Sequence, residues 1–315
     1  MKKYMRVAVL SAIPILFIAP VLISQFTKSE GRSFHGVKLE DTRYVEISFQ
    51  NTAQGIGLGG MLFVPRGEGP FQAVVMIHGS GTSHRDNGWY LTLTQYLQEN
   101  GIVVLLPDKR GSEKSEGDWR TASFDDLATD TWAAIQFLKD QEYVALSHIG
   151  VVGMSQGGWI APVVASKSSD AAFLVNVVGA SVSTHEQLLY EENHNLREIG
   201  FLPGLSNLVA YLSTSYLKNI GQRDFWDAIG DFDPLPHWER LAISSLTLYG
   251  QEDANVPSAE SAARLRSLMN PNIEVRIYEG SGHALEDPEG HGDSIFREDA
   301  LGEIRDFILS VSVHP

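Results

Sequence analysis

The chain has 315 residues, no Cys and a formal net charge of -15 at pH 7. Its length allows one large α/β domain or two smaller ones. The acidic balance argues against a nucleic-acid partner, because such proteins need a basic surface to displace counterions from phosphates. The lack of Cys excludes a thiol nucleophile, a disulfide framework and a cysteine zinc site.

The first 30 residues differ in composition from the rest of the chain. Basic residues near the start precede an uncharged stretch of 21 residues, 7–27. A helix of that length spans about 30 Å, the thickness of a bilayer's hydrocarbon core. We therefore predict a signal-anchor in residues 1–30 that holds the protein in the cell membrane, with residues 31–315 outside the cytoplasm. The alternative is a cleaved signal peptide, which leaves a secreted or periplasmic protein.

After residue 31, short apolar runs alternate with helical patterns, and no internal repeat interrupts them. This alternation predicts an α/β fold with a mostly parallel, doubly wound sheet. Strands are predicted over residues 44–49, 58–64, 73–77, 102–106, 148–152, 173–178, 245–249 and 273–278. Helices are predicted over residues 89–100, 123–138, 159–167 and 294–310.

One stretch, at about residues 180–240, has no buried-strand pattern but is rich in aromatic residues. We interpret it as a helical cap inserted into the domain of residues 31–315, over the carboxyl edge of the sheet. Most of its aromatic side chains are expected to pack in the cap's own core, and some to line a substrate pocket. These aromatic residues are Tyr190, Phe201, Tyr211, Tyr216, Phe225, Trp226, Phe232 and Trp238.

A Gly-x-Ser-x-Gly pattern follows the strand predicted at 148–152, where residues 153–158 read Gly-Met-Ser-Gln-Gly-Gly. A nucleophile elbow needs this context: a strand, a tight turn with small residues around the Ser, and a helix whose amino end points N–H groups at it. We therefore predict that Ser155 is a catalytic nucleophile. The alternative is a tight turn with a hydrogen-bonded hydroxyl.

A serine needs a base to become a good nucleophile, and the base needs an acid to orient it. His283 follows the last predicted strand, where a loop can present it at the carboxyl edge of the sheet. Asp253 follows the preceding strand in the same way. We therefore predict a triad of Ser155, Asp253 and His283. Because of where they stand after the strands, His283 is preferred to His291 as the base, and Asp253 to Glu252 as the acid.

The tetrahedral intermediate of acyl transfer needs N–H donors for its oxyanion. One is expected from Gln156, the residue after the nucleophile. The second is expected from the glycine-rich loop at residues 78–82, with Ser80 preferred and Gly81 as the alternative. In that loop His78 is interpreted as a structural hydrogen-bonding residue rather than as the base.

Together these motifs resemble an α/β-hydrolase of the serine-esterase and prolyl-oligopeptidase-like group. The resemblance covers about residues 40–312 and includes the order Ser, Asp, His along the chain. It rests on the His-Gly-Ser-Gly loop at 78–81, the Asp-Lys-Arg-Gly turn at 108–111, the elbow at 153–158, the acid loop at 250–257 and Gly282-His283. It implies a serine hydrolase without a cofactor. Ser at the elbow argues against the dienelactone type, which has Cys, and against a haloalkane dehalogenase, which has Asp.

The expected function is that of a carboxylesterase that cleaves a small-molecule acyl ester through an acyl-enzyme intermediate. Three alternatives stay open: an aminoacyl peptidase or amidase with Glu191-Glu192 holding a substrate amine, a thioesterase or acyltransferase, and a non-catalytic binding module on the same fold. No metal site is expected, because the loop of Asp287, Glu289, His291 and Asp293 lacks a ligand spacing that we recognise. The residues do not indicate an oligomeric state.

Overall fold

The computed structural model of the chain describes residues 35–288 and 294–311. Within these residues, eight strands form one sheet in the order β1-β2-β4-β3-β5-β6-β7-β8. The strands are β1 (Val45–Asn51), β2 (Ile56–Phe63), β3 (Phe71–Ile77), β4 (Val103–Pro107), β5 (Val144–Met154), β6 (Phe173–Val177), β7 (Ser244–Gly250) and β8 (Ile273–Tyr278).

The sheet is antiparallel at one edge and parallel elsewhere. Strand β2 pairs antiparallel with both β1 and β4, whereas all pairs from β4 through β3 to β8 are parallel. In the centre, Val75 of β3 lies opposite Leu105 on one side and Val151 on the other. Strands buried on both faces account for their continuous apolar sequences. The predicted mostly parallel α/β sheet is confirmed.

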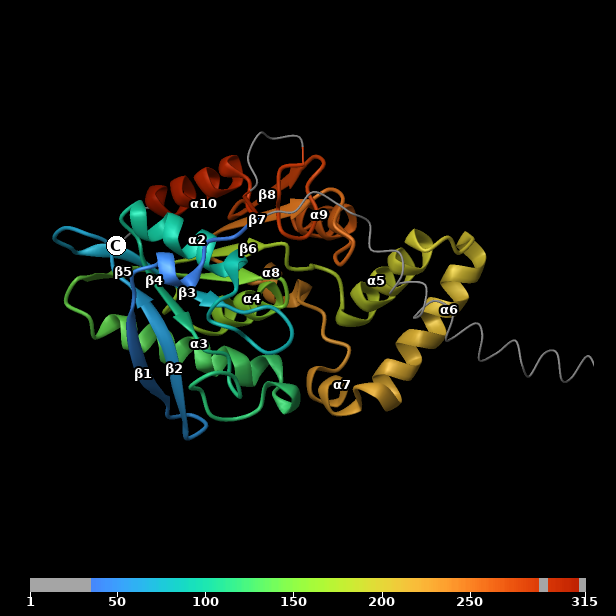
Figure 1. Cartoon of the computed structure of the whole chain (residues 1–315), viewed down its shortest axis with the longest axis horizontal. Coiled ribbons are helices and arrows are strands. Elements are labelled where there is room, and N and C mark those ends of the chain that lie inside the picture. Colours follow the sequence, from blue (N-terminus) through green and yellow to red (C-terminus); the bar gives the residue numbers. More distant parts are fainter. Residues whose placement is uncertain (1–34, 289–293, 312–315) are drawn as a thin grey trace, which may run out of the picture.

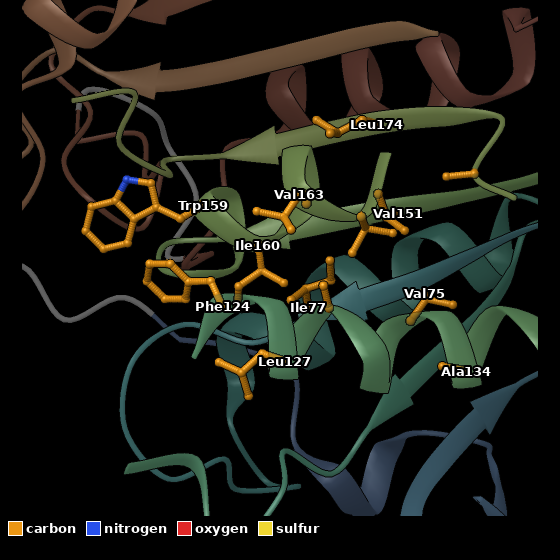
Figure 2. Packing of buried hydrophobic residues seen from close by; sticks show 14 of the residues in the cluster. Val75, Ile77, Phe124, Leu127, Ala134, Val151, Trp159, Ile160, Val163 and Leu174 are labelled. Carbon is orange, nitrogen blue, oxygen red and sulfur yellow. The ribbon is translucent and has the colours of Figure 1, made fainter. Parts of the chain in front are cut away.

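Helices cover both faces of this sheet and bury two separate apolar clusters (Figure 1). On one face, α3, α4 and α9 pack against the strands, and Figure 2 shows Ala134 of α3 near Val75 and Val163 of α4 near Val151. The other face is covered by α2 and α10. The helices are α2 (Gly88–Glu99), α3 (Phe124–Lys139), α4 (Gly157–Lys167), α9 (Ser258–Ser267) and α10 (Glu298–Ser310).

A group of helices is inserted between β6 and β7, and Figure 1 shows α5, α6 and α7 together beside the sheet. The aromatic residues of this region were predicted to pack in its core or to line a pocket. Phe225 and Trp226 line a cavity, and Trp238 is fully buried. Tyr211 and Tyr216 are exposed instead. The inserted elements are α5 (Thr184–Glu198), α6 (Pro203–Tyr216), η3 (Leu217–Gly221), α7 (Arg223–Ile229) and α8 (Leu235–Glu239).

The predicted location in a membrane is contradicted. Within residues 35–288 and 294–311, no helix combines the length and apolar character needed to cross a bilayer. The apolar stretch that prompted the prediction, and with it the boundary at residue 30, lies outside the described residues.

Candidate active site

Ser155 occupies the tight turn between β5 and α4. Its φ is +53°, a left-handed conformation that non-glycine residues adopt at a cost, and its N–H donates to the Val177 carbonyl at 2.9 Å. The turn is so tight that a Cβ on Gly153 would lie 2.2 Å from the Gly157 carbonyl oxygen. Glycine at these positions lets the strand and the helix meet, and the predicted elbow geometry is present around Ser155.

A chain of hydrogen bonds connects three residues that stand far apart in the sequence. His283 Nε2 lies 3.0 Å from Ser155 Oγ, and His283 Nδ1 lies 2.8 Å from Asp253 Oδ2. Ser155 follows β5, Asp253 follows β7, and His283 follows β8, so parallel strands bring all three to one edge of the sheet. This arrangement allows the imidazole to take a proton from the serine hydroxyl.

The Asp253 carboxylate is buried and has donors on both oxygens. Its Oδ2 faces the imidazole, while Oδ1 accepts the N–H groups of Asn255 at 2.8 Å and Val256 at 2.9 Å. The side chain has no exposed surface. A buried charge needs such partners, and they hold the carboxylate in place beside His283. The rival acid, Glu252, is exposed.

Three residues beside Ser155 have backbone N–H groups without an acceptor in the described part of the chain. Gln156, Ser80 and Gly81 line the same cavity as Ser155 and His283. The preceding N–H, of Gly79, is already used, because it donates to the Tyr90 hydroxyl at 2.7 Å. The loop and the elbow can therefore offer two converging donors to an oxyanion.

The cavity beside Ser155 has a volume of about 1180 Å³. Its walls come from the elbow, from the segment at Asp118–Thr121, and from the inserted helices α5 and α7. Glu191 and Glu192 line it, and among residues 35–288 and 294–311 neither has a basic partner: Glu191 accepts from Gln187 and Asn255, and Glu192 accepts from Ser213. In the lining, Arg120 is paired with Asp118.

Two other histidines, His78 and His237, have hydrogen-bond partners outside the chain of Ser155, His283 and Asp253. His78 is buried with Nε2 2.7 Å from the Pro107 carbonyl oxygen, and burial lowers the pKa of its ring to about 4. It is therefore neutral at pH 7 and donates to the carbonyl, in line with the structural role predicted for it. His237 hydrogen-bonds Ser166 away from this cavity. His291, with most of the loop considered as a metal site, lies outside the described residues.

Lys109 is a feature of the site that the sequence did not reveal. Its side chain is buried, and Nζ lies 2.8 Å from both the Gly79 carbonyl oxygen and Gln156 Oε1. It also lies 4.9 Å from the centre of the Trp119 ring. In the sequence Lys109 stood only within the Asp-Lys-Arg-Gly turn, where a lysine is ordinarily exposed.

Comparison with known proteins assigns the chain to a sequence family. The sequence profile described as "BAAT / Acyl-CoA thioester hydrolase C terminal" matches residues 132–289, half of the chain. The chain belongs to this family. A second profile, of the dienelactone hydrolase family, matches residues 58–195 of this α/β hydrolase. Ser at the elbow therefore does not set the chain apart from that family, contrary to the expectation drawn from it.

Individual relatives agree with the resemblance to serine esterases. Esterase EstD of Thermotoga maritima is 25% identical over 287 residues, which cover 87% of this chain and 67% of that protein. The human acylamino-acid-releasing enzyme is 26% identical over 236 residues, which cover 70% of this chain and only 30% of that enzyme. The α/β hydrolase can therefore be called an esterase-like hydrolase.

A solved structure supports the fold independently. The α/β hydrolase GrgF from Penicillium sp. sh18 superposes with a TM-score of 0.64 at 20% identity, and the match covers 85% of this chain and 99% of that one. At this identity the likeness concerns the fold alone.

Proposed function

We propose that this protein is a serine hydrolase that cleaves carboxylic esters through an acyl-enzyme intermediate. The observation that carries the proposal is the hydrogen-bond chain from Ser155 through His283 to Asp253, with spacings of 3.0 Å and 2.8 Å, at the wall of a large cavity. Similarity to an esterase over 87% of the chain supports the choice of ester. Domain limits at residues 31–315, with a cap at about 180–240, are part of the proposal.

In the first half of the reaction, Ser155 Oγ forms a bond to the acyl carbon and its proton passes to His283 Nε2. Asp253 stays ionised and stabilises the imidazolium. The carbonyl oxygen becomes an oxyanion that accepts from the N–H groups of Gln156 and Ser80, with Gly81 as the alternative to Ser80. The bond to the alkoxy oxygen then breaks, and the alcohol leaves with the proton from His283.

In the second half, water takes the place of the alcohol. His283 accepts a proton from the water as its oxygen attacks the acyl carbon, and the same N–H groups receive the second oxyanion. Collapse of this intermediate breaks the bond to Ser155 Oγ, which recovers the proton. The products are a carboxylic acid and the free enzyme. No residue in this sequence of steps requires a cofactor.

Two other substrate classes are supported by specific observations. Glu191 and Glu192 line the cavity without basic partners in the described residues, which favours a substrate that carries an amine, such as an aminoacyl ester or amide. The family's description favours thioesters. The same triad serves all of these acyl groups, so substrates of each class belong in one assay.

The test compares the wild-type protein with Ser155→Ala on p-nitrophenyl butyrate, butyryl-coenzyme A and leucine p-nitroanilide. A matched control is Ser166→Ala, because Ser166 also hydrogen-bonds a histidine, His237, at 2.7 Å but lies elsewhere. We expect ester cleavage that is lost in Ser155→Ala and kept in Ser166→Ala. Full activity in Ser155→Ala would overturn the nucleophile, and a preference for the thioester or the anilide would overturn the ester.

A further inference from the structure

The buried ammonium group of Lys109 contacts both segments that carry the oxyanion donors of the proposed function. One acceptor is the Gly79 carbonyl, in the loop after β3, and the other is the side-chain oxygen of Gln156, in the elbow after β5. Both distances are 2.8 Å. Lys109 itself follows β4, so its side chain links the loops that follow two other strands.

The hydrogen bond from Lys109 to the Gly79 carbonyl orients the N–H group of the next residue, Ser80. The Gly79 carbonyl and the Ser80 N–H belong to the same peptide group, which is trans. In a planar trans peptide the C=O and the N–H point in opposite directions. When Lys109 holds the carbonyl on the inner side of the loop, it turns the Ser80 N–H outward, to the cavity that Ser155 lines.

The contact with Gln156 acts on the other donor. Its side-chain oxygen accepts from Lys109, which fixes the residue whose N–H follows the nucleophile. A cation close to both peptide groups also draws electron density from them and makes their N–H groups stronger donors. Lys109 thus couples the orientation of the two N–H groups through one atom.

The base of the Lys109 side chain is held rigidly. On one side Asp108 accepts two hydrogen bonds from Arg85, at 2.8 Å and 2.7 Å, and on the other Arg110 donates two to Asp130, at 2.7 Å and 2.8 Å. The Lys109 N–H donates to Ser83 Oγ, in the loop after β3, at 3.0 Å. A turn fixed in this way gives Nζ a defined position.

Burying an ammonium group at this position is energetically unfavourable, so the need to fill space does not explain why the residue is a lysine. The residue is only 7% exposed, and within the described residues Nζ has no carboxylate partner. Burial without a counter-ion disfavours the ammonium and lowers the pKa of Lys109 to about 7. An apolar side chain would fill the space without this penalty. The features that a lysine adds are its N–H donors.

We propose that Lys109 is a positioning residue for the oxyanion hole, which it holds in shape through the Gly79 carbonyl and the Gln156 side chain. This inference rests on the proposed function of Ser155. Lys109 does not line the cavity and touches no reacting atom. Its effect is therefore expected in kcat, where oxyanion stabilisation is expressed, and not in KM.

The test uses Lys109→Met and Lys109→Gln, two side chains of similar length of which only Gln can donate hydrogen bonds. With p-nitrophenyl butyrate we expect Lys109→Met to lower kcat roughly 10- to 100-fold, less than the loss of a whole oxyanion donor, with KM changed less than about 3-fold. Lys109→Gln should recover a large part of that loss. Lys114→Met, in the same turn but exposed and paired with Glu46, should leave kcat unchanged.

Other outcomes overturn the proposal in recognisable ways. Wild-type kcat in Lys109→Met, or no difference between the Met and Gln variants, would contradict a donor role for Lys109 while Ser155-dependent activity still upheld the proposed function. Activity that survives in Ser155→Ala would remove the proposed function itself. Should Lys109→Met fail to fold, Gln156→Met removes the same contact and keeps the Gln156 N–H. It should lower kcat several-fold, and an unchanged kcat would refute the proposal.

Discussion

At the scale of single residues, the arrangement around Asp253 fixes which way the imidazole faces. Two backbone N–H groups hold one carboxylate oxygen, so the other is left for His283 Nδ1. A hydrogen on Nδ1 leaves Nε2 free to accept a proton from Ser155. In the proposed mechanism the acid therefore acts through the tautomer of His283, and its charge stabilises the imidazolium that forms.

Replacing Asp253 by Asn tests this role without changing the size of the side chain. An amide can donate to Nδ1 and select the wrong tautomer, so we expect kcat to fall roughly 1,000- to 10,000-fold, as in other triads, with little change in KM. The control is Glu252→Gln, the same change at the exposed neighbour. Steady-state kinetics on p-nitrophenyl butyrate measure both, and a fall of less than about 10-fold in Asp253→Asn would assign the acid elsewhere.

The lowered pKa of Lys109 predicts how the free energy of unfolding changes with pH. Its pKa is lowered from 10.5 to about 7 by burial, so between these pH values the unfolded chain binds more protons than the folded one. The free energy of unfolding should therefore rise with pH across this window, by at most about 1.4 kcal/mol per pH unit. Nearby, His78 is already neutral, and Asp108 and Arg110 are in ion pairs.

Urea unfolding of the wild type and of Lys109→Met at a series of pH values isolates this contribution, since other titrations cancel in the difference. The advantage of Lys109→Met over the wild type should be greatest below pH 7 and should shrink as the pH rises toward 10. A difference that does not change with pH would mean that Lys109 keeps an ordinary pKa in the folded protein.

The candidate triad could be found from sequence because each member follows a predicted strand, and parallel strands bring such positions to one edge. Lys109 and the Tyr90 hydroxyl could not be found in this way. Their roles depend on burial and on partners from other strands, such as Gln156 and Gly79. Neither spacing nor local composition records those contacts.

At the scale of elements, the crossing of β5 and α4 depends on glycine. A Cβ on Gly157 would lie 2.1 Å from the Ile77 carbonyl oxygen, so the start of α4 is pressed against the end of β3. This contact also sets the distance between the elbow and the loop that begins at His78. The two segments that carry the proposed oxyanion donors are thus held together by backbone packing as well as by Lys109.

The variant Gly157→Ala should be damaged in both stability and activity. Its methyl group meets a backbone atom that cannot turn aside, so we expect a loss of about 1–3 kcal/mol in the free energy of unfolding, typical of overpacking, with slower ester cleavage. Gly204→Ala, in α6 with open space around it, should change stability by less than about 1 kcal/mol. Equal stability of Gly157→Ala and the wild type in urea would contradict this account of the elbow.

All eight strands were predicted within a few residues of their observed bounds, because apolar runs between turn residues are a strong local signal. Helix limits were less accurate. The last helix was predicted from residue 294 but begins at Glu298, because Ser294 forms a bridge with His35 and the Ile295 N–H donates to His35. Helix α9 was not predicted, since its short sequence carries a weak apolar pattern between polar residues.

At the scale of the whole molecule, both the protein and the lining of the cavity contain more acidic than basic residues. The net charge is -15, and the cavity contains Glu191 and Glu192 without basic partners in the described residues. A field of this sign raises the local concentration of cationic and neutral substrates relative to anionic ones. The charge therefore favours uncharged esters and amine-bearing acyl groups over polyanionic thioesters of coenzyme A.

The dependence of rate on salt tests this preference. Between about 0.02 M and 0.3 M NaCl, screening shortens the reach of the field. We expect kcat/KM for the anionic p-nitrophenyl succinate to rise several-fold over this range, while kcat/KM for neutral p-nitrophenyl butyrate stays nearly constant. A fall in the succinate rate would instead indicate a basic binding site for the substrate.

The most direct test of the central claim is to find which residue a fluorophosphonate attacks. Such a probe reacts with a serine only when a base and an oxyanion site activate it, so it needs no knowledge of the natural substrate. Mass spectrometry of the intact protein and of its peptides is predicted to show one adduct, on Ser155, that is absent from His283→Ala. An adduct on another serine, or a folded protein that does not react, would contradict the account.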